Sequence, residues 1–268
     1  MAAVAASEED LALAHELADL ADEITMGRFR AEDLVIETKP DLTPVSEADR
    51  AVEQALRDRL AVLRPDDAVM GEEYGARGAR AGADAKRRWI VDPIDGTMSY
   101  VRGVPVWGTL LALEEDGELT LGVVSAPALG RRWWGSAGRG SFARENGTTR
   151  SLRVSGVREL ADAQLCFSDY DGWLREGRIG ALLDLSARCW RTRGYGDFWQ
   201  HMLVAEGAAE IAVDPDVSVW DLAAVLVVVR EAGGCLTDLD GMQRADGGDG
   251  VSTNGLLHDE VLAALRGS

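Results

Sequence analysis

Residues 89–100 read WIVDPIDGTMSY, an apolar run that leads into two acids. The run Trp89–Val91 predicts the end of a buried strand. Pro93 has a fixed φ angle and no N–H, so it suits a strand terminus or a bulge. Asp92 precedes this proline and Asp95 follows it, which predicts two carboxylates at the point where a strand ends.

Gly96 and Thr97 come next and predict the opening of a helix or tight turn. Such an opening exposes backbone N–H groups, which bind anions. Two carboxylates beside an anion repel it unless cations lie between them. A pair of Mg²⁺ ions resolves the conflict, because magnesium binds a few carboxylates together with water and phosphate oxygens. A simpler interpretation also fits the pattern, in which Asp92 caps a turn and Asp95 caps a helix.

The composition limits the classes of protein to which the chain can belong. Its 268 residues allow one large domain or two smaller ones that share an interface, and its hydrophobic fraction of 46% is typical of globular proteins. The formal net charge of -18 argues against a nucleic-acid partner, which needs clustered Lys and Arg. We expect no membrane span and no signal peptide. Cys166, Cys189 and Cys235 predict reduced thiols in a cytoplasmic protein.

The first part of the chain, residues 1–150, predicts an α+β half. An amphipathic helix is expected over 7–30, and a second helix begins after Ser46, a good N-cap, and extends to about Leu63. Strands follow, among them a hairpin over 106–127. Two loops are predicted between these elements, one at 39–49 that runs into the second helix and a small, basic, mobile one at 76–88.

From about residue 151 the pattern changes to helices that alternate with strands, which predicts a smaller α/β half over 151–268. One helix is closed by Gly233 and Gly234 before a strand begins. The acid-rich segment 238–250 lacks the spacing of a calcium-binding loop and is expected to be solvated.

Three further acids accompany the opening motif. Glu72 and Glu73 lie in GEEYG at the end of a predicted strand, where solvated loop acids are the simpler interpretation. Asp221 lies in the first turn of an apolar helix, where a carboxylate also complements the helix dipole.

Taken together, GEE, then DPIDGT, then WD before an apolar helix ending in EAGG resemble the inositol monophosphatase family. That family consists of magnesium-dependent phosphatases of small phosphomonoesters. The segments ETKPDLTPVSEADRAVE, YVRGVPVW, GVVSAPALGRRWW, WRTRGYGDFW and VSVWDLAA are similar to its actinobacterial histidinol-phosphate phosphatases. The resemblance implies a layered αβαβα sandwich, with an antiparallel sheet in the first half, a metal site between the halves, and a homodimer.

The resemblance also implies roles for individual residues. The metal ligands would be Glu72, Asp92, the backbone carbonyl of Ile94, Asp95 and Asp221, holding two or three Mg²⁺ ions. The catalytic residues would be Thr97, Asp49 and Glu72, with Thr97 and Asp49 orienting the attacking water and taking its proton. The substrate-binding residues would be Gly96, Thr97, Arg191, Asp197, Asp214 and Asp221.

Simpler interpretations stand beside three of these roles. Asp49 occupies the N3 position after Ser46 and fits a capping box. Arg191 fits a surface charge, and Asp197 fits a helix N-cap before Phe198.

The expected activity is hydrolysis of L-histidinol phosphate to L-histidinol and phosphate, in which acids suit the cationic amine and imidazolium of the alcohol. Two departures bear on the substrate: Met98 stands where relatives carry lysine, and residues 167–173 are more acidic than expected. One alternative is therefore a phosphatase of inositol 1-phosphate or another cyclitol or sugar phosphate. Another is a homologue that binds metal or phosphate without catalysis.

Overall fold

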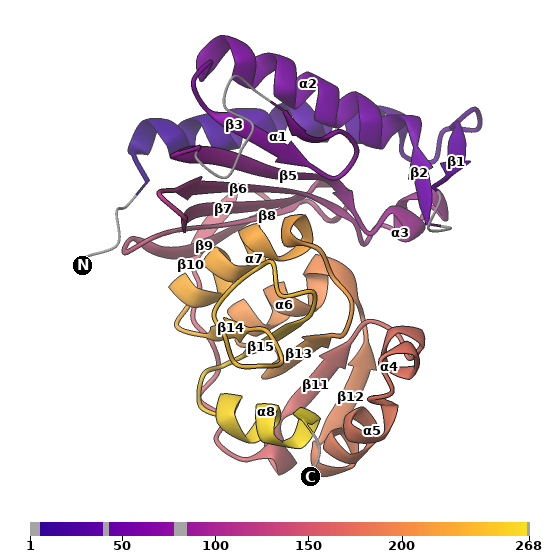
Figure 1. Ribbon diagram of the computed structural model, residues 1–268, viewed down its shortest axis with the longest axis vertical. Coiled ribbons are helices and arrows are strands. Elements are labelled where there is room, and N and C mark those ends of the chain that lie inside the picture. Colours follow the sequence, from indigo (N-terminus) through magenta and orange to yellow (C-terminus); the bar gives the residue numbers. More distant parts are fainter. Residues whose placement is uncertain (1–5, 40–42, 78–84, 267–268) are drawn as a thin grey trace.

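The structure, a computed structural model, describes residues 6–39, 43–77 and 85–266. Helices and sheets alternate in five layers (Figure 1). Helices α1 and α2 cover the outer face of an eight-stranded sheet, and α6 and α7 lie between this sheet and a five-stranded one (Figure 1). Helices α4, α5 and α8 cover the far face of the second sheet (Figure 1). The predicted αβαβα sandwich is confirmed.

The α-helices are α1 Glu8–Arg28, α2 Glu47–Leu63, α3 Thr97–Val101, α4 Asp171–Arg175, α5 Ile179–Arg188, α6 Asp197–Ala205, α7 Val219–Glu231 and α8 His258–Arg266. Short 3₁₀ helices span Pro127–Leu129 and Leu160–Asp162. Ser7 and Ser46 begin α1 and α2 with capping boxes, as predicted. Among the described helices, none combines the length and apolarity needed to cross a membrane.

The first sheet has the strand order β10-β9-β8-β7-β6-β5-β3-β4. Its strands are β3 Ala68–Gly71, β4 Gly75–Arg77, β5 Arg87–Asp95, β6 Gly108–Glu115, β7 Glu118–Ala126, β8 Arg131–Ser136, β9 Gly140–Glu145 and β10 Thr148–Ser151. The pairing is antiparallel, as predicted, except that β3 runs parallel to β5. The predicted hairpin is the β6–β7 pair.

The second sheet has the strand order β12-β11-β13-β15-β14. Its strands are β11 Gln164–Phe167, β12 Arg191–Gly194, β13 Ile211–Asp214, β14 Cys235–Thr237 and β15 Gly250–Thr253. Strands β12, β11 and β13 are parallel, whereas β15 and β14 pair antiparallel. A boundary between the halves at residue 150 stays a prediction, and β10 spans that position.

Strand β5 shows how the side-chain pattern positions the site. Trp89 and Val91 are buried against the α1–α2 layer, whereas Ile90 is buried against the α7 layer. Successive side chains of a strand point to opposite faces, so Asp92 leaves the sheet on the face of Ile90. The carboxylate is therefore directed toward α7 and the second half of the chain.

Three local predictions were wrong. The loop predicted at 39–49 contains β2, Pro44–Ser46, which pairs with β1, Ile36–Thr38, while residues 40–42 lie outside the described part. The helix itself begins at Glu47, directly after the predicted N-cap Ser46. The loop predicted at 76–88 overlaps β4 and the start of β5, while residues 78–84 lie outside the described part. Strands β1, β2 and β4 have three residues each, too few for an apolar alternation to mark them.

The third error concerns the end of β5. The strand was predicted to end before Pro93 but continues to Asp95. Its register against β6 shifts between Asp92 and Asp95, and the proline lies in this irregularity. A residue without an N–H is tolerated there because the ladder of hydrogen bonds is already interrupted.

Candidate active site

Three acids meet where the end of β5 faces the start of α7. One carboxylate oxygen from each of Asp92, Asp95 and Asp221 lies within 4.8 Å of the other two. In a regular strand, residues three apart point to opposite faces, but the register shift between Asp92 and Asp95 realigns them. Both aspartates are buried, at 1% and 8% exposure.

A peptide N–H holds one oxygen of each of these carboxylates. Asp92 Oδ1 accepts from the N–H of Ile94 at 3.0 Å, and Asp95 Oδ2 accepts from Phe198 at 2.6 Å. Asp221 Oδ2 accepts from Ser218 at 2.7 Å in the capping box that begins α7. Each acid is thus fixed in orientation and keeps a second oxygen for the centre of the cluster.

The cluster is electrostatically suited to a cation. Burial raises the pKa values of Asp92 and Asp95 well above their usual range, and neighbouring carboxylates raise them further. Burial also raises the pKa of Asp221, to about 6. Hard, fixed carboxylate oxygens that repel one another match the donor set that Mg²⁺ prefers, so these residues fit the predicted metal.

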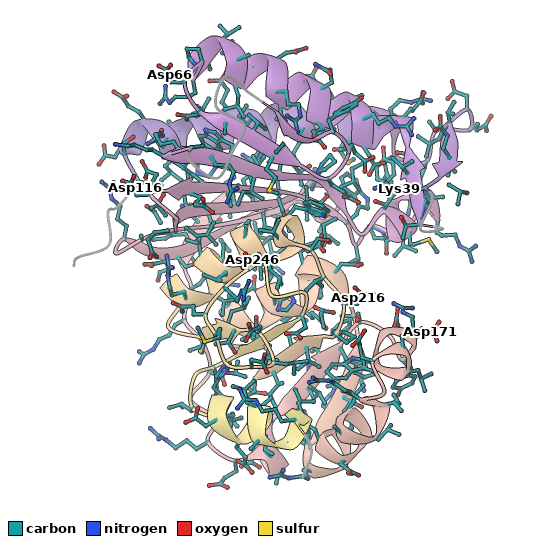
Figure 2. The ribbon with its side chains drawn as sticks, in the orientation of Figure 1. Lys39, Asp66, Asp116, Asp171, Asp216 and Asp246 are labelled. Carbon is teal, nitrogen blue, oxygen red and sulfur yellow. The ribbon has the colours of Figure 1, made fainter. Side chains whose placement is uncertain are left out.

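Glu72 lies beside this group, in the turn between β3 and β4. Its charge contributes to the raised pKa values of Asp92 and Asp221. Its Oε1 lies 2.6 Å from Lys39 Nζ, which is also 2.6 Å from Glu73 Oε1. Lys39 follows β1 in the first half of the molecule (Figure 2). No local sequence pattern indicated this pairing, because Lys39 and Glu72 are 33 positions apart.

The predicted pair Thr97 and Asp49 is brought together. Thr97 Oγ1 lies 3.2 Å from Asp49 Oδ1 and 2.9 Å from the carbonyl oxygen of Ile94. The other Asp49 oxygen accepts the N–H of Ser46 at 2.8 Å and its hydroxyl at 2.6 Å. Asp49 therefore caps α2 with one oxygen and reaches the site with the other. Burial raises its pKa.

Gly96 connects β5 to α3 in the left-handed region, at φ 82°. A Cβ atom at this position would lie 3.1 Å from Asp197 Oδ2 and 3.1 Å from the Val106 carbonyl oxygen. Glycine is thus required both by the backbone angle and by the close approach of Asp197. Phosphate binding by Gly96 and Thr97 stays a prediction.

Asp197 begins α6 with φ 51° and faces Gly96. Burial raises its pKa to about 7, helped by the charges of Asp214, Asp221 and Asp169. The N-cap interpretation is wrong, because Gly196 is the N-cap of α6 and Asp197 is already its first residue. The acidic segment 167–173 contributes Asp169 to this environment.

Asp214, at the end of β13, is held by two side chains that sequence inspection missed. Its Oδ2 accepts from Gln200 Nε2 at 2.6 Å and lies 2.8 Å from His201 Nε2. His201 Nδ1 lies 2.7 Å from Ser252 Oγ, so the histidine spans the two groups. These four residues are buried, and the network fixes the Asp214 carboxylate beside the acidic cluster.

Arg191 is not brought to the acidic cluster by any contact among the described residues. It begins β12, and the strand then advances three residues to Gly194 before it turns toward Asp197. At about 3.3 Å per residue, this places Arg191 roughly 10 Å back along the strand. Its guanidinium carbon lies 5.3 Å from the Trp190 ring centre. Its substrate role stays a prediction.

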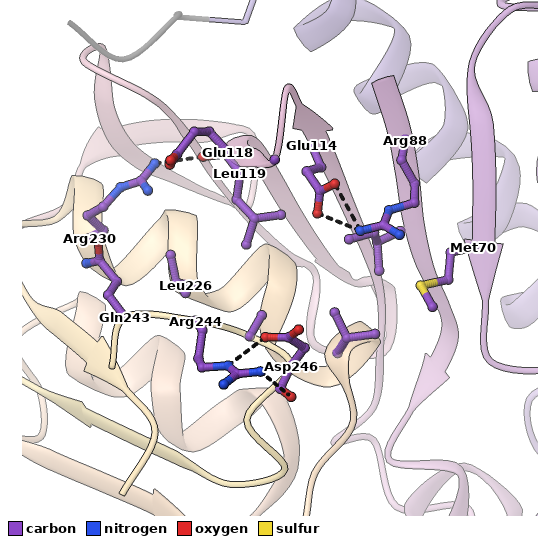
Figure 3. Close-up of a pocket in the computed structure, with 14 residues that line it drawn as sticks. Met70, Arg88, Glu114, Glu118, Leu119, Leu226, Arg230, Gln243, Arg244 and Asp246 are labelled. Carbon is purple, nitrogen blue, oxygen red and sulfur yellow. Dashed lines mark hydrogen bonds and ion pairs between the residues drawn. The ribbon is translucent and has the colours of Figure 1, made fainter. Parts of the chain in front are cut away.

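A separate cavity of about 290 Å³ lies between the first sheet, helix α7 and residues 243–246 (Figure 3). The ion pairs Arg88–Glu114 and Arg244–Asp246 flank it. Its lining includes Met70, Ile90 and Val219, each two residues before a predicted metal ligand, but none of the ligands themselves. The cavity is therefore next to the acidic cluster along the chain but does not include it.

Comparison with known proteins confirms the resemblance. The chain matches the inositol monophosphatase family over residues 6–267. It is 57% identical over 261 residues to a histidinol-phosphatase of Mycobacterium tuberculosis (strain ATCC 25618 / H37Rv), covering 97% of this chain and 99% of the relative. A histidinol-phosphatase of Streptomyces coelicolor (strain ATCC BAA-471 / A3(2) / M145) is 51% identical over 263 residues, covering 96% and 97%.

The fold has a counterpart among solved structures. The extragenic suppressor protein suhB from Bartonella henselae superposes with a TM-score of 0.87 at 25% identity, covering 97% of this chain and 100% of that one. The chain is a phosphoric monoester hydrolase and belongs to the inositol monophosphatase family.

Proposed function

We propose that the chain is a Mg²⁺-dependent phosphatase that hydrolyses L-histidinol phosphate to L-histidinol and phosphate. The observation that carries the proposal is the adjacency of two acidic groups. Asp92, Asp95 and Asp221 form a cation site for the phosphate end of a substrate. Asp197 and Asp214 add negative charge next to it, which favours an alcohol that carries a cation. The two histidinol-phosphatase relatives support the same substrate.

Two or three Mg²⁺ ions would be held by the side chains of Glu72, Asp92, Asp95 and Asp221 and by the Ile94 carbonyl. When bound, they would neutralise the clustered carboxylates, stabilise charge on the phosphate oxygens and acidify water. Lys39 contacts one carboxylate oxygen of Glu72. For Glu72 to bind the metal, Lys39 must either keep only that contact or move away from the glutamate.

Asp49 and Thr97 act on the attacking water in this proposal. The Thr97 hydroxyl passes its proton to Asp49 Oδ1 as it takes one from the water, so Thr97 is unchanged and the proton of the water ends on Asp49. Burial raises the pKa of Asp49, which makes its carboxylate a stronger base. The capping bonds from Ser46 keep this carboxylate in place during the transfer.

Asp214 and Asp197 bind the amine or imidazolium of the alcohol. Gln200 and His201 both contact Asp214 Oδ2, which leaves Oδ1 for the substrate cation. Asp197 lies against Gly96, where the cation end and the phosphate end of the substrate would meet.

The proposal also includes a homodimer, a cytoplasmic location and Arg191 as a substrate ligand. Light scattering on the purified protein tests the dimer.

Steady-state phosphate release over a panel of esters tests the function. The panel contains L-histidinol phosphate, inositol 1-phosphate and glucose 1-phosphate, each with Mg²⁺ and with a chelator. We expect Mg²⁺-dependent release with histidinol phosphate as the preferred ester. Good release from inositol or sugar phosphate alone would assign the alternative substrate, and no release from any ester would favour a binding protein.

A further inference from the structure

Glu53 is a buried acid that none of the roles above uses. It lies on α2, one turn after Asp49, and its side chain is 0% exposed. An ionised carboxylate is costly to bury, so its partners show what it does. Among the described residues these partners are one arginine and two peptide N–H groups.

Both peptide N–H groups belong to the turn that carries Glu72. Glu53 Oε2 accepts the N–H of Glu73 at 2.7 Å, and Oε1 accepts the N–H of Tyr74 at 3.2 Å. The turn joins β3 to β4, and its other anchor is the Glu72 N–H, which donates to the Val91 carbonyl at 3.3 Å. Glu53 therefore fixes the turn from the side of α2, while β5 fixes it beside Asp92.

Arg57 strengthens the same attachment. Its Nε donates to Glu53 Oε1 at 2.8 Å, and its guanidinium also donates to the carbonyl oxygens of Val69 and Gly75. Val69 and Gly75 lie on β3 and β4, one before and one after the turn. The Glu53–Arg57 pair thus binds donors within the turn and acceptors on both flanking strands.

Gly71, the last residue of β3, leaves room for this carboxylate. A Cβ atom at Gly71 would lie 2.2 Å from Glu53 Oε1, which no side chain could tolerate without displacing the acid. Gly71 directly precedes Glu72, so the close packing occurs next to the predicted ligand.

We propose that Glu53 is a positioning residue for the metal site: its carboxylate holds the Glu72–Tyr74 turn and so sets where Glu72 presents its own carboxylate. The inference rests on the proposed function, in which Glu72 is a metal ligand. Partners of metal ligands set the orientation of those ligands, and their loss lowers metal affinity by about 10–100-fold. Helix α2 thereby serves the site twice, through Asp49 and through Glu53.

Two variants test the role. Glu53→Gln keeps the shape but offers one acceptor oxygen in place of two, and Glu53→Asp keeps the charge but withdraws it by one methylene group. Gln54→Ala is the matched control, because Gln54 is the exposed neighbour on the same helix. Each protein is measured for melting temperature, for Mn²⁺ binding by calorimetry, and for phosphate release over a range of Mg²⁺ concentrations.

We expect both Glu53 variants to raise the half-saturating Mg²⁺ concentration and the Mn²⁺ dissociation constant by about tenfold or more. The rate at saturating Mg²⁺ should fall less than the rate at low Mg²⁺, and Gln54→Ala should match the wild type. A lower melting temperature with unchanged metal affinity in either variant would overturn the inference. A wild type without any metal-dependent release would instead overturn the proposed function, so the two failures are distinguishable.

Discussion

The hydroxyl oxygen of Thr97 lies 3.2 Å from a carboxylate oxygen of Asp49, although 48 positions separate the two residues. Asp49 is fully buried at the start of α2, and Thr97 opens α3 directly after the acidic end of β5. The contact joins the helical layer of the first half to the end of β5 that carries Asp92 and Asp95. In the proposed function, this contact is the route by which a proton leaves the attacking water.

Removing this route should slow the reaction without unfolding the protein. Asp49→Asn keeps an oxygen that can accept the Ser46 N–H, so the helix cap survives. We expect kcat to fall by about 10²-fold or more, because general base catalysis contributes that much, and Thr97→Ala should act in the same direction. An unchanged kcat in both variants, at saturating Mg²⁺ and substrate, would remove the pair from the mechanism.

Asp95→Asn should abolish turnover and also stabilise the metal-free protein. The substitution removes a buried carboxyl group that must either carry a charge beside Asp221 or take up a proton, and its oxygen can still accept the Phe198 N–H. The melting temperature in a chelator should rise by roughly 2–4 °C for each kcal/mol of relieved repulsion. Asp116→Asn, in an exposed turn, is the control. Full activity in Asp95→Asn contradicts the metal assignment.

The metal-free protein should lose stability as the pH rises from about 7 to about 8. The pKa of Asp197 is raised to about 7, and those of Asp92 and Asp95 lie well above their usual range. The folded state therefore holds more protons than the unfolded state in this window, so stability falls as they are lost. His15 and His258 have lowered pKa values and act oppositely, but only up to about pH 6.5.

Calorimetric melting in a chelator measures this pH dependence. Saturating Mg²⁺ should flatten the decline, because the ionised carboxylates are then neutralised. A melting temperature that rises from pH 7 to pH 8 in the chelator would show that these acids do not form a strained, uncompensated cluster.

Asp214→Asn should impair cationic substrates more than neutral ones. A hydrogen bond to a charged group contributes about 1.5–3 kcal/mol, so kcat/KM for L-histidinol phosphate should fall about tenfold or more. The value for glycerol 2-phosphate, which has no cation, should change little. Equal losses for both esters would indicate that Asp214 supports the fold of the site and does not select the substrate.

Sequence patterns predicted the features that depend on neighbouring residues. The capping boxes at Ser7 and Ser46 and the turn at Gly96 are short-range, and each is present. The layered fold and the grouping of Asp221 with Asp92 and Asp95 followed from motif resemblance, because spacing alone cannot join residues so far apart. The short strands β1, β2 and β4 gave no apolar alternation to detect.

Contacts between segments far apart in the sequence could not be predicted from the sequence. No sequence motif marks Lys39, Gln200 or His201. Their proximity to the site is visible only in the fold, which brings them into contact with Glu72 or Asp214. From the sequence, Glu53 is expected to be a solvent-exposed acid of an amphipathic helix, but in the structure it is fully buried. Met98, which raised doubt about the substrate, is 62% exposed at the second position of α3, so it does not fill the Gly96–Thr97 turn.

The most direct test of the central claim is a competition between two substrates in one reaction. L-Histidinol phosphate and inositol 1-phosphate are mixed at equal concentration with limiting enzyme and Mg²⁺, and both alcohol products are quantified over time. The proposed cation site with Asp197 and Asp214 beside it predicts that histidinol forms first and that a chelator stops both reactions. Earlier formation of inositol, or release that persists in the chelator, would contradict the account.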